Sequence, residues 1–230
     1  MVKNDIVYIL KSDIQPDELR YSLRSVCKNF PHKRIWFYGG CPEGIKPDMM
    51  VEFTQTGVNK WEKVNNTLKA ICKNGEITED FWLFNDDFFI MKKLTKLEPM
   101  VGGSLYARCA RIVKKYGRET SYAAQLQATA RELKARGYDR LDYALHVPML
   151  INRTKGLETL RTFKGFPMFR SLYGNMHEIG GIISKDVKIQ DESVPTGAEA
   201  LISTNDLSFR DGAVGKYIRD AFPDKCKYEI

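Results

Sequence analysis

The sequence predicts an α/β domain in which helices flank a mainly parallel sheet. Residues 6–10 form a continuous apolar run, typical of a strand that is buried on both faces of a parallel sheet. Residues 17–26 place Leu19, Leu23 and Val26 on one helical face, and residues 34–38 are again strand-like and end at a Gly-Gly pair. This order is that of a strand–helix–strand unit with parallel strands.

The following segments repeat the alternation of strand and helix. Residues 50–53 predict a short third strand, and residues 61–71 predict an amphipathic helix because apolar side chains recur at helical spacing. The run at 81–90 then returns to a strand pattern. In such a sheet, ligands collect beyond the carboxyl ends of the strands. With 230 residues, of which 43% are hydrophobic, the chain can bury the core of one large domain, residues 1–230.

The second half of the sequence adds helices around this sheet. Residues 104–137 are helix-compatible and predict two helices that break near Gly117. We describe residues 104–140 as a basic helical insertion. The remaining predictions are a strand and loop returning to the sheet (141–150), a short helix (155–162), a loop-rich stretch (166–177) and a helix near the end (213–222).

The stretch Phe-Trp-Leu-Phe-Asn-Asp-Asp-Phe-Phe-Ile, residues 81–90, carries the strongest chemical signal. It reads as a buried strand that is interrupted by Asn85, Asp86 and Asp87. Two adjacent carboxylates repel each other, and burying one without a partner is costly, so a divalent cation at a strand end would explain them. The alternative is an Asn-Asp-Asp turn that joins two hydrophobic strands.

The positive charge of the chain is concentrated in one segment. The formal net charge is +7, and residues 101–140 hold nine basic residues against three acidic ones. This segment is either a solvated basic face or a groove for a polyanionic acceptor.

The five cysteines are widely spaced without a C-x-x-C pair, which indicates reduced thiols. No apolar stretch is long enough to span a bilayer and the N-terminus lacks a signal-peptide pattern, so we expect a cytoplasmic protein.

Histidines and arginines supply the remaining candidates. His177 could complete a metal shell with the two aspartates or act as a general acid or base, and His146 is either a core histidine or a catalytic contact. Arg20, Arg24 and Arg170 are candidate phosphate ligands, because a guanidinium group matches phosphate oxygens. The sequence has no Walker A or G-x-G-x-x-G pattern, which disfavours P-loop and Rossmann nucleotide binding.

Three stretches in this order, residues 17–26, 34–37 and 81–89, resemble the second conserved block of the Stealth family. Stealth proteins transfer sugar phosphates from nucleotide sugars and are related in fold to the GT-A glycosyltransferases. His146-Val147-Pro148 resembles the family's later histidine-proline block, and Arg170 lies where a phosphate-binding arginine would be expected. The resemblance therefore implies a GT-A-like fold and a transferase that uses a nucleotide sugar, such as a UDP-sugar.

Other parts of the chain depart from that family. Residues 6–13 keep a strand followed by Asp13 but lack the usual Tyr-Thr-Trp-Val-Asp opening, and residues 203–229 resemble the tail of small phage-type glycosyltransferases. These departures favour glycosyl transfer over sugar-1-phosphate transfer to a polysaccharide, and both reactions stay open. A third alternative is a non-enzymatic nucleic-acid-binding module that uses the basic helices.

The leading hypothesis is a metal-dependent glycosyltransferase with a polyanionic acceptor, such as modified DNA or an acidic glycan. Mn²⁺ or Mg²⁺ is expected to bind Asp86, Asp87 and His177. The expected catalytic residues are Asp87, His146 and His177. The donor is expected to contact the following side chains: Asp13, Arg20, Arg24, Asn85 and Arg170.

Overall fold

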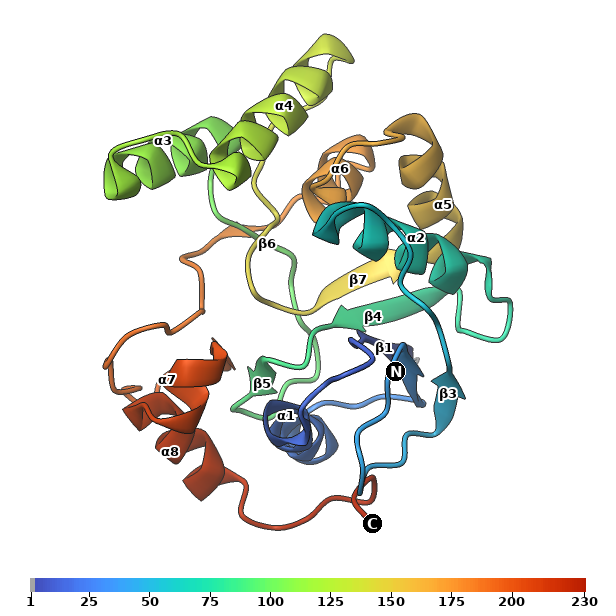
Figure 1. The fold of residues 1–230 in the computed structure, drawn as a ribbon, viewed down its shortest axis with the longest axis vertical. Coiled ribbons are helices and arrows are strands. Elements are labelled where there is room, and N and C mark those ends of the chain that lie inside the picture. The colour runs from blue at the N-terminus through green and yellow to red at the C-terminus, as the bar shows by residue number, and fades with distance from the viewer. Residues whose placement is uncertain (1–2) are drawn as a thin grey trace.

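A central sheet lies between helices in the computed structural model, which describes residues 3–230 (Figure 1). The sheet has five strands. Met1 and Val2, which belong to the expected domain 1–230, lie outside the described residues. The strand order is β3-β2-β1-β4-β7, and only β7 runs antiparallel to its neighbour. This confirms the expected mainly parallel sheet. The strands are β1 (Asp5–Ile9), β2 (Ile35–Tyr38), β3 (Met49–Val51), β4 (Asp80–Phe84) and β7 (Met149–Asn152).

Helices cover both faces of this sheet. Because side chains alternate along a strand, Ile6 and Tyr8 face one way and pack with the apolar side of α1 (Pro16–Asn29). Val7 faces the other way and belongs to a second core with residues of α2 and α6. Figure 1 shows α1 on one side of the sheet and three helices on the other: α2 (Lys60–Lys73), α5 (Arg153–Thr162) and α6 (Phe169–Met176).

The run at 81–90 is not one interrupted strand. It contains β4, a turn at Asp86 and Asp87, and β5 (Phe88–Ile90), which leaves the central sheet and pairs antiparallel with β9 (Leu201–Ser203). The alternative, a turn between two strands, is therefore the correct local structure, since Asn and Asp readily adopt turn conformations. A third small sheet pairs β6 (Met100–Val101) with β8 (Ile182–Ile183).

The basic segment forms two helices, as expected, and they are α3 (Leu105–Tyr116) and α4 (Ser121–Ala135). Gly117 ends α3 in the left-handed conformation, with φ at 67°, which suits a residue without a Cβ atom. The side chains of Ser104 and Thr120 cap the two helix starts. A separate apolar cluster, which includes Leu105, Leu126 and Leu172, packs this pair against α6.

Two further helices match the expectation, whereas α6 differs from it. The predicted helices at 155–162 and 213–222 are confirmed as α5 and α8 (Ala213–Ala221). The loop predicted at 166–177 is wrong, because residues 169–176 form α6. This helix has no side-chain cap and contains Gly174, so its sequence lacks the usual helix signals.

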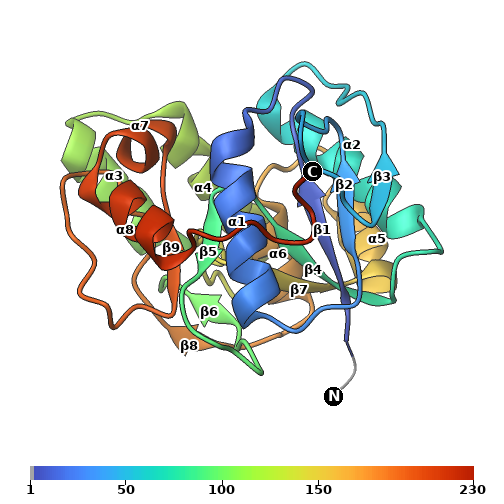
Figure 2. The ribbon, with the colours of Figure 1, turned by 90° about the horizontal axis from the view of Figure 1, so that it is seen from below.

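The C-terminal segment follows α7 (Asp206–Arg210) and α8, and Figure 2 shows it crossing α1 and ending beside the central sheet. Backbone hydrogen bonds join Lys46 to Tyr228 and Ile230 to Gly44 there. The far end of the chain is thus fixed to the loop that follows β2.

Within residues 3–230, no helix combines the length and the apolar composition that crossing a membrane requires.

Candidate functional site

A cleft of about 2570 Å³ opens at the carboxyl ends of the parallel strands. Asp13 reaches it from the segment after β1, Gly40 from the segment after β2, and Asn85, Asp86 and Asp87 from the turn after β4. Chain order dictates this convergence, because parallel strands present their carboxyl ends at one edge of the sheet. Residues of α3, residues 144–146, α6 and the segment after β8 also line the cleft.

The acidic turn holds Asp87 firmly but leaves it incompletely bonded. One carboxylate oxygen, Oδ2, accepts hydrogen bonds from Lys188 Nζ at 2.9 Å and from Ser203 Oγ at 3.1 Å. Asp87 is only 9% exposed, and its other carboxylate oxygen, Oδ1, is buried without a hydrogen-bond partner among residues 3–230. A buried acceptor without a partner costs free energy, so this oxygen has the capacity to bind a ligand.

Negative charge accumulates around the turn. Burial, and to a smaller extent the charge of Asp87, raise the pKa of Asp86 to about 6. Burial also raises the pKa of Glu18, in the first turn of α1, to about 7, with contributions from Asp86, Asp87 and Asp206. Sequence reasoning missed Glu18, because an acid in a first helical turn is typical of any helix. Carboxylates that repel one another in this way gain most from a cation.

Arg170 lies beside the turn with part of its guanidinium group free. Its Nη1 donates to the carbonyl of Val147, and its plane lies over the Phe88 ring at 5.4 Å. Its Nη2 is buried and has no partner in the described part of the chain. Burial lowers the pKa of Arg170 to about 10 against the opposing effect of Asp87, so the group stays charged at neutral pH.

His146 lines the same cleft, and its ring is bonded to a carboxylate that sequence reasoning did not identify. Nδ1 of His146 lies 3.0 Å from both carboxylate oxygens of Asp186, in the segment after β8. The structure thus brings together six of the expected residues in one cleft: Asp13, Asn85, Asp86, Asp87, His146 and Arg170.

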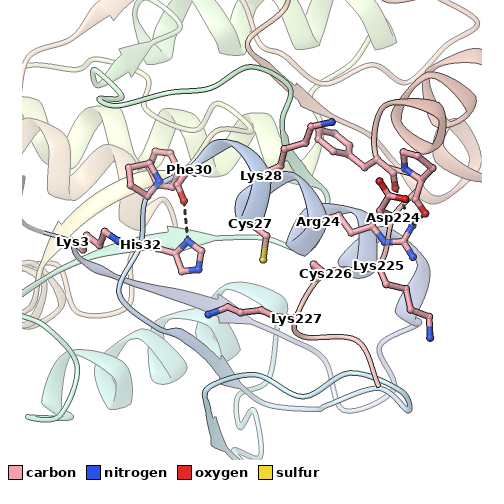
Figure 3. Close-up of a pocket in the computed structure, with 13 residues that line it drawn as sticks. Lys3, Arg24, Cys27, Lys28, Phe30, His32, Asp224, Lys225, Cys226 and Lys227 are labelled. Carbon is pink, nitrogen blue, oxygen red and sulfur yellow. Dashed lines mark hydrogen bonds between the residues drawn. The ribbon is translucent and has the colours of Figure 1, made fainter.

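The other three expected residues lie outside this cleft. Arg20 and Arg24 of α1 both bind Glu229 of the C-terminal segment, whose side chain is fully buried. Figure 3 shows Arg24 in a second pocket, of about 560 Å³, between α1 and that segment. His177 ends α6, where Nε2 lies 3.0 Å from Thr159 Oγ1. His177 is therefore not positioned to bind a metal at the acidic turn, and Arg20 and Arg24 are not positioned to bind a donor in the cleft.

Within residues 3–230, no group of three or more His, Cys, Asp or Glu side chains is arranged to hold a metal ion. The expected set of Asp86, Asp87 and His177 is accordingly not assembled. The acidic turn offers two carboxylates, and Mg²⁺ that is shared with substrate phosphates is commonly held by one or two carboxylates of a protein.

Comparisons with known proteins bear on the fold. No family model and no curated protein matches the chain. Among solved structures, an active-site mutant of LgtC is 12% identical, with a TM-score of 0.51, over 97% of this chain and 98% of that one. The chain has a GT-A-like fold. At this identity the similarity concerns the fold alone.

Two further structures are more distant. The galactosyltransferase LgtC in complex with donor and acceptor sugar analogues is 12% identical, with a TM-score of 0.49, over 97% of this chain and 98% of that one. The glycosyltransferase GlyE of Streptococcus pneumoniae is 9% identical, with a TM-score of 0.40, over 97% of this chain and half of that one. The resemblance to Stealth proteins and to phage-type enzymes stays a prediction from sequence.

Proposed function

We propose that this protein is a glycosyltransferase that uses a nucleotide-sugar donor in the cleft beyond β4. The proposal is supported by the GT-A-like fold that the chain shares with LgtC. The observation that carries it is the acidic turn at a strand end, where Asp87 keeps a buried carboxylate oxygen without a partner. The volume of the cleft, about 2570 Å³, leaves room for both a donor and an acceptor.

The acidic turn fits Mn²⁺ or Mg²⁺. Both ions prefer oxygen ligands, and Mg²⁺ is commonly held by one or two carboxylates together with substrate phosphates. Asp86 and Asp87 would supply the carboxylates, with Oδ1 of Asp87 free for this purpose and Oδ2 held by Lys188. When bound, the cation neutralises the charge that grows on the departing phosphates.

Other residues of the cleft would orient the donor. Asp13 and Asn85 follow the two strands between which the donor would lie, and both line the cleft. Arg170 supplies a fixed positive charge whose Nη2 is free to bind a phosphate oxygen. These groups are held by the sheet and by α6, so they need little rearrangement on binding.

His146 is our candidate for the general base. The acceptor hydroxyl would give its proton to the imidazole while the acceptor oxygen forms the new bond to the donor. Attack at the sugar carbon releases a nucleoside diphosphate, and attack at phosphorus, as in Stealth proteins, releases a nucleoside monophosphate. Chromatography of the released nucleotide therefore distinguishes glycosyl transfer, which we expect, from sugar-phosphate transfer.

The acceptor is proposed to be polyanionic, such as DNA or an acidic glycan. Arg108, Arg111 and Lys115 of α3 line the cleft on the side away from the sheet, at the spacing of one helical face. Arg111 and Lys115 are exposed. Phosphate or carboxylate groups of an acceptor would lie along this face, with its hydroxyl near His146.

Salt dependence and a pair of matched variants test the acceptor class. Binding of a DNA or acidic-glycan oligomer should weaken as salt increases. The double variant Arg111→Gln/Lys115→Gln should weaken it further. Arg131→Gln/Lys134→Gln removes the same charge from exposed positions of α4 that do not line the cleft, and should have a smaller effect. Equal losses in the two variants, or binding that is indifferent to salt, would exclude this acceptor surface.

A screen of nucleotide sugars for metal-dependent hydrolysis tests the function itself. We expect at least one donor to be hydrolysed slowly with Mn²⁺ and not with a chelator, because water replaces the absent acceptor. Salt-sensitive nucleic-acid binding without hydrolysis of any donor would favour the non-enzymatic alternative, for which the basic residues of α3 and α4 are the only support.

A further inference from the structure

The contact between His146 and Asp186 determines which ring nitrogen carries a proton. Nδ1 lies 3.0 Å from each oxygen of Asp186, and the backbone N–H of His146 also donates to Oδ1 at 3.2 Å. An ionised carboxylate can only accept hydrogen bonds, so Nδ1 must be the protonated nitrogen. In the neutral imidazole, Nε2 then carries the free lone pair.

Asp186 is itself fixed and charged. Its Oδ2 lies 3.3 Å from Nη2 of Arg108, and Nη1 of Arg108 is paired at 3.1 Å with the fully buried carboxylate of Asp142. Burial alone raises the pKa of Asp186, but the hydrogen bonds from His146 and the charge of Arg108 outweigh it and lower that pKa to about 2. Asp186 is therefore ionised at any pH at which the protein is expected to work.

The same segment connects the histidine to the acidic turn. Lys188, two residues after Asp186, donates to Asp87 at 2.9 Å. On the other side of the histidine, Arg170 binds the carbonyl of Val147 and lies over Phe88, the residue after Asp87. His146 is thus held to the acidic turn through two independent connections.

The free nitrogen of His146 is accessible to a ligand. Its side chain is 30% exposed and lines the cleft, and Nε2 has no hydrogen-bond partner within residues 3–230. His177, in contrast, has Nε2 bonded to Thr159 and to the carbonyl of Lys155. Of the two histidines predicted as catalytic, only His146 therefore combines a fixed Nδ1 with an unbonded Nε2.

We propose that Asp186 is a positioning residue that holds His146 with Nδ1 protonated and Nε2 free to accept the proton of the acceptor hydroxyl. This inference rests on the proposed function. The O–H bond of the acceptor breaks as its proton passes to Nε2. The acceptor oxygen bonds to the donor, and the nucleotide leaves with the electron pair of the broken bond. Asp186 stabilises the imidazolium that results.

Histidine tautomers can be measured directly, because the chain holds only three histidines. Nitrogen NMR of protein labelled with ¹⁵N-histidine should show His146 with a proton on Nδ1 at a pH where the ring is neutral. His146→Gln identifies the signal by its loss. The measurement requires no substrate, and a proton on Nε2 instead would overturn the proposal.

Kinetics of Asp186→Asn test the consequence. The amide can present its N–H to Nδ1 and so favour the wrong tautomer, which should lower kcat about a hundredfold and leave the donor KM unchanged. Its NMR spectrum should show His146 protonated on Nε2. Asp191→Asn is the control. Asp191 lies in an exposed loop five residues after Asp186, where its carboxylate accepts a hydrogen bond from Ser193, and its replacement should leave kcat unchanged.

The outcomes separate this inference from the function on which it rests. Turnover that survives Asp186→Asn would overturn the positioning role alone, and so would an equal rise in donor KM with an unchanged kcat. Failure of every nucleotide sugar to react with the wild-type protein, with Nδ1 of His146 protonated, would refute the proposed function and with it the role of base, but not the measured tautomer.

Discussion

Two clusters of charged side chains in this molecule differ in how completely they are bonded. At the C-terminal segment, Arg24 donates to both carboxylate oxygens of Glu229 at 2.7 and 2.8 Å and to the carbonyls of Phe222 and Pro223. In the cleft, Asp87 Oδ1 and Arg170 Nη2 are buried without partners among residues 3–230. Folding explains the first cluster completely, whereas the second has bonding capacity left for a ligand.

The two clusters also differ in how the pKa values of their carboxyl groups are shifted. Around Glu229, two arginines offset the charge of one carboxylate. Burial raises the pKa of Glu229, but the hydrogen bond from Arg24 and the charges of both arginines outweigh burial, so the pKa is lowered. Around the acidic turn, the pKa values of Asp86 and Glu18 are raised by burial and by neighbouring carboxylates. The first cluster stabilises the fold, whereas repulsion in the second opposes it, and the cation that we propose would offset that repulsion.

The largest effect is expected from Asp87→Asn. Asparagine keeps the size of the side chain and can still accept a hydrogen bond from Ser203, but it removes the charge that would hold a cation. We expect donor turnover to fall about a thousandfold, which corresponds to about 4 kcal/mol, while the circular dichroism spectrum is retained. Steady-state kinetics with Mn²⁺ measure this, and unchanged turnover would remove the metal role from the acidic turn.

A loss of stability without loss of activity is expected from Arg24→Gln. This change leaves the buried carboxylate of Glu229 with the weaker contact of Arg20, at 3.4 Å, and should lower the free energy of unfolding by about 3 kcal/mol. Turnover per folded molecule should be unaffected. Urea unfolding and kinetics at a temperature where the variant is folded measure the two quantities.

Arg210→Gln is the matched control for that change. The ion pair of Arg210 with Asp211 is exposed on both sides, so its removal should leave the urea midpoint unchanged. If Arg24→Gln abolished donor turnover at a temperature where the protein is folded, the assignment of this cluster to stability would be wrong.

A pH dependence of stability, without loss of activity, is expected from Glu18. Its pKa is raised to about 7 in the folded protein from about 4.5, so the folded state holds this proton more tightly than the unfolded state. The resulting stabilisation is complete below pH 4.5 and is lost as the pH rises through about 7. Unfolding of wild type and Glu18→Gln across this window measures it.

Glu119→Gln, at an exposed position between α3 and α4, provides the comparison for Glu18→Gln. The stability difference between Glu18→Gln and wild type should change from pH 4.5 to 7 and then remain level, while the Glu119 variant parallels wild type throughout. Parallel curves for all three proteins would mean that Glu18 does not hold a proton near the acidic turn.

The sequence was sufficient for those parts of the fold that depend on local patterns. The apolar runs at residues 6–10 and 35–38 belong to strands that are buried on both faces, and α1 and α2 show clear helical spacing. The acidic turn was found because Asp86 and Asp87 interrupt such a run. β5 could not be assigned correctly, because its partner β9 lies more than a hundred residues away.

Contacts between residues far apart in the sequence also explain which site residues were predicted wrongly and which were missed. Arg20, Arg24 and Arg170 look alike in sequence, and only the distant Glu229 shows that the first two complete an ion-pair network. Asp186 and Lys188 carry no motif, and their roles follow from contacts with His146 and Asp87. Side chains that meet across long sequence separations leave no periodic signal.

The measurement that tests the central claim most directly is calorimetric titration with a set of nucleotide sugars, with and without Mn²⁺. We expect at least one donor to bind only with Mn²⁺, to lose this binding in Asp87→Asn, and to keep it in folded Arg24→Gln. Absence of binding by every donor in the presence of Mn²⁺, or binding that neither the metal nor Asp87→Asn affects, would contradict the account.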